Sequence, residues 1–273
     1  MTTVLVPPET ARPGSGAPRR IRALAAAETR LLLRNRTAVV NSVLAPLLLV
    51  AAVRLVAPDG DPGAGPALVV TAIAVGLVFT TYYNLVTTFV ARREELVLQR
   101  MRTGELTDAE VLLGTALPSL LVTLAQVVVV LAGAVVIGEW SAPVDVVLPV
   151  LATVAGALLM VLLAAASTAF TGTAESAQIT TMPFVVAATS LSGLFIPLTA
   201  FPEPLAAVAR FLPLTPVVEL TRLGLVGRTW DGVPVADVAD AWAHAALPSA
   251  VLAGWLLAAA LLAPRVFRWA PRR

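Results

Sequence analysis

The sequence contains neither lysine nor cysteine, and each absence excludes a class of chemistry. All 19 basic residues are arginine, so the chain cannot supply the lysine that grips phosphate in a G-x-x-x-x-G-K-[ST] loop. Any work driven by ATP must therefore be done by another polypeptide. Without cysteine there is no disulfide, thiol nucleophile or cysteine-ligated metal. His244 is the only histidine, and no Ser-His-Asp arrangement can be argued from it.

Charged residues are also scarce. They make up 13% of the chain, whereas 58% of the residues are hydrophobic and the mean hydropathy is +0.87. In soluble domains roughly a quarter of all residues are charged, so this composition indicates an integral membrane protein. A tail rich in proline and glycine at residues 1–18 is expected to be disordered, and residues 19–273 are expected to form one transmembrane domain. The bias toward alanine, valine, leucine and arginine suggests a bacterial source.

Six apolar stretches predict an all-α polytopic bundle of six transmembrane helices. The expected spans are at about residues 37–57, 67–90, 111–137, 144–170, 179–198 and 245–263. A basic amphipathic segment at residues 19–36 predicts an interfacial helix before the first span. Four prolines, at positions 202, 204, 213 and 216, break the stretch between the fifth and sixth spans into pieces too short to cross. That stretch predicts a re-entrant or surface-lying external segment.

The distribution of arginine predicts the orientation. Six spans place both termini on one side, and fifteen arginines lie on that side: at positions 12, 19, 20, 22, 30, 34 and 36, at 92, 93, 100 and 102, and at 265, 268, 272 and 273. By the positive-inside rule, this side is cytoplasmic. Although the sequence pI is near 9.9, the arginines gather at the chain ends and in one loop, which argues against a nucleic-acid partner.

A charged loop, RREELVLQRMRTGELTDAE at residues 92–110, separates the second and third spans. Leu96, Leu98, Met101 and Leu106 alternate with charged residues, which predicts a short amphipathic helix. A mixed-charge surface with apolar anchors is typical of a protein–protein contact, although a solvated connector is the plainer alternative. The T-D-A-E sequence at residues 107–110 predicts a capping box at the start of the next helix.

Two segments of the chain resemble one family. ARREELVLQRMRTGELTDAEVLLG resembles the cytoplasmic loop between spans two and three of the ABC-2 type permeases, which are membrane subunits of ATP-binding-cassette exporters. LSGLFIPLTAFPEPLAAVARFLPLTPVVELTRLGLVG is similar to the end of span five and the external re-entrant segment of that family. Together with the six-span layout, the resemblance covers about residues 19–268.

The resemblance implies a transport subunit that is not itself an enzyme. Such a permease pairs with a second permease, identical or related, and with two copies of a separate ATPase that binds ATP and Mg. It exports a drug, an antibiotic, a lipid or a lipid-linked glycan from the bacterial plasma membrane. By the same resemblance, residues 93–102 form a coupling helix, and the ATPase-coupling residues are Arg93, Glu94, Glu95, Leu98, Arg100, Met101, Arg102 and Glu105. The connection at residues 171–178, with Glu175, is a weaker second contact.

Polar residues within the spans are few. Tyr82, Asn84 and Gln126 are the candidates for a transport pathway, although hydrogen bonding between helices explains them equally well. No span carries a central carboxylate, which argues against the main alternative, an ion-coupled secondary transporter or channel. A non-transporting membrane scaffold is a third hypothesis. On the external side, Glu219 and Arg222 are spaced for an ion pair on one helix.

Overall fold

The computed structural model describes residues 63–102, 106–136 and 140–270, together with the isolated positions 22, 26, 29, 30 and 48. These described residues form helices joined by short loops, and they contain no strand. The predicted tail and nearly all of the first span lie outside the described residues. Of the predicted interfacial helix, only Arg22, Ala26, Thr29 and Arg30 are described, and each is helical.

Within the described residues, four helical segments are long and apolar enough to cross a bilayer. The first, residues 64–94, consists of α3 (Ala64–Val75), a π-helix η1 (Gly76–Tyr83) and α4 (Asn84–Glu94). The others are α6 (Asp108–Val136), α7 (Val147–Ser167) and α12 (Ala246–Val266). They confirm long apolar helices where the second, third, fourth and sixth spans are predicted, with ends that differ by a few residues.

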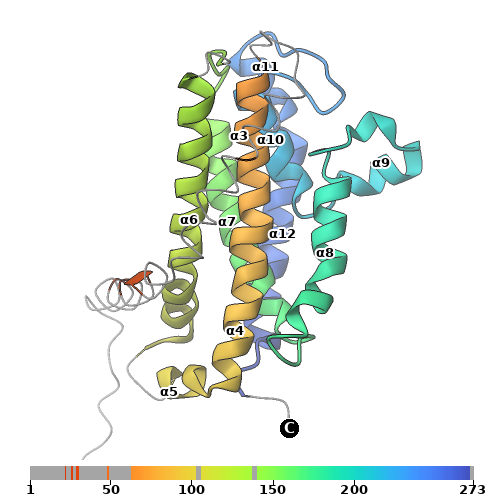
Figure 1. Ribbon diagram of the computed structural model, residues 1–273. Coiled ribbons are helices and arrows are strands. Elements are labelled where there is room, and N and C mark those ends of the chain that lie inside the picture. Colours follow the sequence, from red (N-terminus) through yellow and green to blue (C-terminus); the bar gives the residue numbers. More distant parts are fainter. Residues whose placement is uncertain are drawn as a thin grey trace, which may run out of the picture.

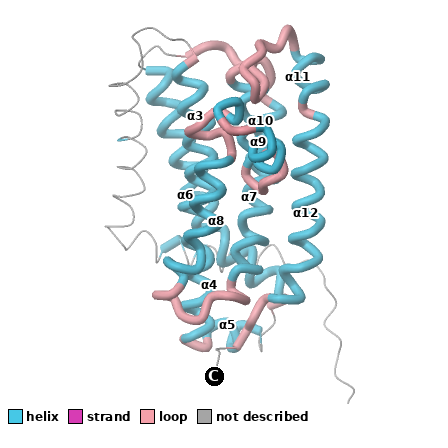
Figure 2. Tube along the Cα trace, turned by 90° about the vertical axis from the view of Figure 1, so that its right-hand side faces the viewer, coloured by secondary structure: helices cyan, strands magenta, loops and turns pink. Residues whose placement is uncertain are grey.

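The helix expected at residues 179–198 is shorter than predicted. It is α8 (Ala177–Leu191), which has 15 residues and falls below the length of the spanning helices. It ends because Gly193 adopts φ +77°, a left-handed conformation that glycine reaches without a steric cost. A short turn η2 (Leu198–Ala200) and α9 (Glu203–Ala209) follow. In Figure 1, α9 projects sideways from the bundle, and Figure 2 views the bundle from this side, with α9 facing the viewer.

The spanning helices run side by side and leave connections at two ends (Figure 1). One end carries α5 (Val97–Arg102), and the other carries α11 (Val238–His244). The chain end after α12 lies at the α5 end, where the Phe267 ring packs edge-on against Phe89 of α4 with centroids 5.7 Å apart. Loops likewise gather at both ends of the tube in Figure 2. The α4–α5 corner and the end of α12 therefore share one side of the bundle.

Helix α10 (Thr215–Leu225) packs deep against the start of α7. Gly224 allows this approach, because a Cβ atom there would lie 2.7 Å from the carbonyl oxygen of Asp145 and would also meet the ring of Pro149. Gly156 of α7 faces Val217 in the same way, with a Cβ position 2.9 Å from a methyl carbon. Small residues thus bring the two helices together, as they do between membrane helices in general.

Asp145 fixes the beginning of α7. Its Oδ1 accepts the backbone N–H of Leu148 at 2.8 Å, and its Oδ2 accepts the indole N–H of Trp242 in α11 at 2.9 Å. Burial favours the neutral acid, but these hydrogen bonds outweigh it and hold the pKa of Asp145 below its ordinary value. The carboxylate therefore links three elements at the end of the bundle opposite α5.

Candidate functional site

The corner between α4 and α5 is made by Leu96. This residue has φ +62°, the one non-glycine positive φ among the described residues. A left-handed leucine costs free energy, and such strain is concentrated at functional sites. The expectation of a single helix over residues 93–102 is wrong at its start, because Arg93 and Glu94 end α4 and α5 begins only at Val97. Figure 1 shows α5 turned away from the direction of α4.

Arg93 lies inside the protein and is fully buried. Its Nη1 donates to the carbonyl oxygen of Thr168 at 2.9 Å. Its Nη2 donates to the carbonyl oxygens of Thr171 at 2.6 Å and Gly172 at 2.9 Å. These carbonyls follow the end of α7, where exposed C=O groups attract a cation. Arg93 therefore holds the α7–α8 connection against the corner and offers no side-chain surface to a partner.

Glu94 makes a second link to the same connection. Its Oε2 accepts the backbone N–H of Ala174 at 3.0 Å. Glu175, the predicted weaker contact residue, is exposed on this connection. The α4–α5 corner and residues 168–176 thus form one hydrogen-bonded unit, although about 80 residues separate them in the sequence.

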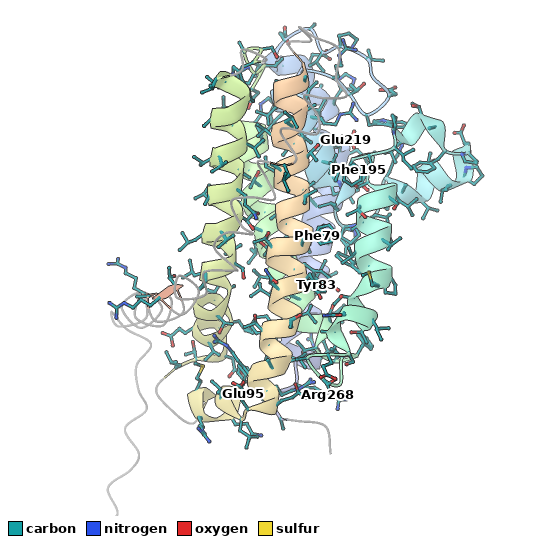
Figure 3. All side chains as sticks on the ribbon, viewed as in Figure 1. Phe79, Tyr83, Glu95, Phe195, Glu219 and Arg268 are labelled. Atoms are coloured by element: carbon teal, nitrogen blue, oxygen red, sulfur yellow. The ribbon has the colours of Figure 1, made fainter. Side chains whose placement is uncertain are left out.

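The remaining predicted coupling residues divide into exposed and buried groups. Glu95, labelled in Figure 3, is exposed, and so is Arg100. Leu98 is fully buried in the core and Met101 is half-buried, so both anchor α5 to the bundle. Arg102 is the last residue of α5, with a side chain outside the described part, and Glu105 lies outside it entirely.

Leu96 belongs to the exposed surface, although the predicted coupling residues do not include it. Its side chain is 41% exposed. The only feature of the sequence that could have indicated this exposed position is the alternation of Leu96 with charged residues. Glu95, Leu96 and Arg100 together are called the corner surface below.

The capping box predicted after the loop is confirmed. Glu110 Oε2 accepts the backbone N–H of Thr107 at 2.7 Å. In return, Thr107 Oγ1 accepts the backbone N–H of Glu110 at 3.3 Å. Helix α6 accordingly begins at Asp108.

The three candidate pathway residues have different environments. Tyr82 is buried, shares a 3.0 Å hydrogen bond with Ser167 of α7, and packs on Phe184 of α8. Gln126 of α6 is half-buried and accepts the hydroxyl of Thr80 at 2.9 Å. Asn84 is exposed. The structure therefore places Tyr82 and Gln126 in contacts between helices and leaves Asn84 facing outward.

The π-helix η1 could not be predicted from the sequence. Its wider turns lie where Gly76 meets Thr123 of α6, whose Oγ1 donates to the Gly76 carbonyl oxygen at 3.2 Å. Such segments occur frequently at functional sites. They also change which residues share one side of the helix. The exposed or half-exposed residues from η1 into α4 are Phe79, Thr80, Tyr83, Asn84, Thr87 and Thr88. Figure 3 labels Phe79 and Tyr83 on this helix.

No group of three or more His, Cys, Asp or Glu residues that could hold a metal occurs among the described residues. The ion pair expected between Glu219 and Arg222 is wrong. Both side chains are half-buried on α10, and no salt bridge within 4.0 Å joins them in this described region. Burial raises the pKa of Glu219 to about 7, partly offset by Arg210 and Arg222.

A comparison with protein families identifies a match over most of the chain. The model of the ABC-2 type transporter family matches residues 19–226 of the 273. The matched segment includes the corner surface, the α7–α8 connection and α10. No curated protein sequence is significantly similar to the chain.

Proposed function

Because the chain belongs to the ABC-2 type transporter family, we propose that it is the membrane subunit of an ATP-driven exporter in a bacterial plasma membrane. A separate ATPase, present in two copies, binds ATP and Mg and hydrolyses the nucleotide. A second permease subunit, most simply another copy of this chain, completes the pathway. The observation that carries this proposal is the corner surface, where exposed Glu95, Leu96 and Arg100 stand on a buried, hydrogen-bonded base.

The proposed topology has six spans and cytoplasmic termini. The short α8 serves as the fifth span, and residues 192–237 with α9 and α10 form a re-entrant external segment before α11. The six prolines in this segment and the depth at which α10 packs on α7 support this arrangement. The α5 end of the bundle is then cytoplasmic, as the distribution of arginine suggests.

The proposed coupling is mechanical. The ATPase holds α5 through the corner surface and contacts the α7–α8 connection through Glu175. When the two ATPase copies close on ATP, each moves its corner surface. Arg93 carries that movement into α7 and α8, because its guanidinium binds the connection between them.

The proposed pathway follows the exposed residues of η1 and α4. Asn84, Tyr83 and Phe79 contribute polar and aromatic groups along one exposed strip of this helix. A second permease covering this strip would enclose it between the two subunits. Tyr82 and Gln126 then hold this helix against α7 and α6, through hydrogen bonds to Ser167 and Thr80.

The test uses charge reversal at the corner surface. Glu95→Arg and Arg100→Glu are expected to abolish ATP-dependent export and the co-purification of the ATPase encoded by an adjacent reading frame, while membrane insertion stays normal. Arg228→Glu, an exposed reversal at the other end of the bundle, is the matched control and should retain both. Unchanged export in the corner variants, with activity that follows an ion gradient, would instead establish a secondary transporter.

A further inference from the structure

A pocket opens at the end of the bundle opposite the corner surface. It has a volume of about 240 Å³ and lies between α3, residues 193–197 and α10. Val70, Leu194, Phe195 and Val218 give it a largely apolar lining, and Arg222 is the one charged residue that lines it. Figure 3 labels Phe195 and Glu219 at this level of the bundle, far from Glu95.

Arg222 is chemically available in this pocket. Its side chain is half-buried, and it forms no hydrogen bond or salt bridge with any residue that the structure describes. A guanidinium carries five N–H donors in a planar fork that matches the oxygens of phosphate or carboxylate. A partly desolvated arginine without a protein acceptor therefore favours an anionic ligand.

A narrow recess continues from the pocket beside Arg222. It has a volume of about 10 Å³ and is lined by Ser192, Glu219 and Trp230, among others. The Oγ of Ser192 is buried and has no hydrogen-bond partner within the described ranges. A recess of about 10 Å³ has room for about one water molecule, so a larger ligand in the pocket would meet Arg222 and not Ser192.

The charged side chains around the pocket are positive on balance. Arg210 lies over the ring of Trp230, with its guanidinium carbon 3.6 Å from the centroid, and it acts on Glu219 together with Arg222. Asp231 and His244 are the other titratable groups that influence Glu219. Because burial raises the pKa of Glu219 to about 7, this carboxyl is only partly charged at neutral pH and does not cancel both arginines.

The mouth of the pocket is apolar. Phe195, which lines the pocket with Leu194, is 59% exposed. A free inorganic anion would gain nothing from these apolar side chains. A ligand with a hydrocarbon tail would remove their surface from water, at about 25 cal/mol per Å².

We propose that this pocket binds the phosphate group of an anionic amphiphile, with the phosphate on Arg222 and the hydrocarbon against Leu194 and Phe195. The amphiphile is either a phospholipid of the surrounding membrane or an exported amphiphile on its way out. Both sources present the same chemistry to the pocket. Binding involves neither the ATPase nor the corner surface, so it is tested separately from the proposed export.

The test measures binding to the purified full-length chain in a non-ionic detergent by native mass spectrometry. The probes are dodecyl phosphate, phosphatidylglycerol and inorganic phosphate. We expect the wild type to bind dodecyl phosphate, and Arg222→Gln to weaken that binding about tenfold or more, as the loss of charge-assisted hydrogen bonds predicts. Arg222→Lys keeps the positive charge and loses the planar set of N–H donors, so its affinity for dodecyl phosphate should lie between those of the wild type and Arg222→Gln.

Two further variants keep the test decisive. Thr71→Phe fills the pocket from α3 without changing Arg222, so it should weaken binding even if Arg222→Gln folds poorly. Arg268→Gln removes an exposed arginine at the other end of the bundle that does not line the pocket, and this variant should bind like the wild type. Binding of phosphatidylglycerol as well would identify a membrane phospholipid as a sufficient ligand, whereas binding of dodecyl phosphate alone would identify a diffusible single-chain amphiphile.

The proposal is overturned if wild type binds neither amphiphile, or if Arg222→Gln and Thr71→Phe both bind as the wild type does. Equal affinity for inorganic phosphate would also overturn it, because the apolar mouth would then contribute nothing.

Discussion

Arg93 and Thr171 are joined by a 2.6 Å hydrogen bond, from the guanidinium Nη2 to the backbone carbonyl oxygen, although 78 residues separate them in the sequence. The same guanidinium also reaches Thr168 and Gly172. One buried side chain therefore ties the corner that bears α5 to the connection between α7 and α8. In the proposed exporter, a force applied at α5 reaches both of those helices through Arg93.

Replacing Arg93 separates docking from transport. Arg93→Gln removes the charge-assisted bonds to three carbonyl oxygens and should lower the free energy of unfolding by roughly 1.5–3 kcal/mol. The corner surface stays exposed, so the ATPase should still bind and hydrolyse ATP. The amount of substrate exported per ATP, measured in proteoliposomes, should fall sharply.

The matched control is Arg92→Gln. The neighbouring Arg92 donates to Thr115 of α6 at 3.0 Å, so its side chain reaches a different helix from the one that Arg93 contacts. The Arg92→Gln variant should export the wild-type amount of substrate per ATP hydrolysed. A normal ratio in Arg93→Gln would contradict the coupling role of this residue.

Leu96 offers a pair of substitutions that differ in their effect on stability. Leu96→Gly removes the strain of the left-handed conformation and should stabilise the protein by about 1 kcal/mol. Leu96→Ala keeps the strain. Both lose the apolar anchor and should weaken ATPase binding by about 1 kcal/mol or more if Leu96 is a central contact. Thermal unfolding and titration of the ATPase measure the two effects, and wild-type affinity in both variants would exclude Leu96 from the contact.

Two glycines test the packing of α10. Gly224→Ala places a Cβ atom 2.7 Å from the carbonyl oxygen of Asp145, and overpacking of this kind costs about 1–3 kcal/mol. Gly254→Ala in α12 is the control, because nothing lies within 4 Å of the added atom. Thermal unfolding in detergent should show a lower midpoint for the first variant only. Equal midpoints would mean that α10 is free to move away from α7.

The stability of the protein should depend on Glu219 near neutral pH. The pKa of this carboxyl is raised from 4.5 to about 7, so the folded state favours the protonated form. Its contribution to stability is complete below pH 4.5 and is lost as the pH rises through 7. Glu219→Gln should therefore be more stable than the wild type at pH 8, with a difference that shrinks by pH 5. A difference that does not change between these pH values would contradict the raised pKa.

The features that the sequence predicted well are those set by neighbouring residues. Long apolar runs predicted helices at about residues 67–90, 111–137, 144–170 and 245–263, because the length needed to cross a bilayer is fixed. The structure has them at 64–94, 108–136, 147–167 and 246–266. The T-D-A-E sequence predicted the capping box, since both partners lie within one turn. Glu95 and Arg100 were predicted as exposed coupling residues, and their exposure is consistent with that role without testing it.

The features that the sequence did not reveal depend on distant partners or on backbone conformation. Arg93 was predicted as an ATPase-coupling residue from the family resemblance of the loop, whereas its acceptors are backbone carbonyls at residues 168–172. No residue type marks the π-helix at Gly76–Tyr83. The early end of α8 had one available signal, the Ser192–Gly193 pair inside an apolar run, where glycine can adopt a left-handed conformation.

The central claim is that an ATPase docks on the corner surface, and the absence of cysteine from the chain permits a direct test. A single cysteine is introduced at Leu96 or, as the control, at Val233, which is exposed at the opposite end of the bundle. Each variant is labelled with a photoreactive maleimide in membranes that also contain the ATPase encoded by an adjacent reading frame. The account predicts a cross-link to that ATPase from position 96 and none from position 233. Export that continues while position 96 yields no cross-link would contradict it.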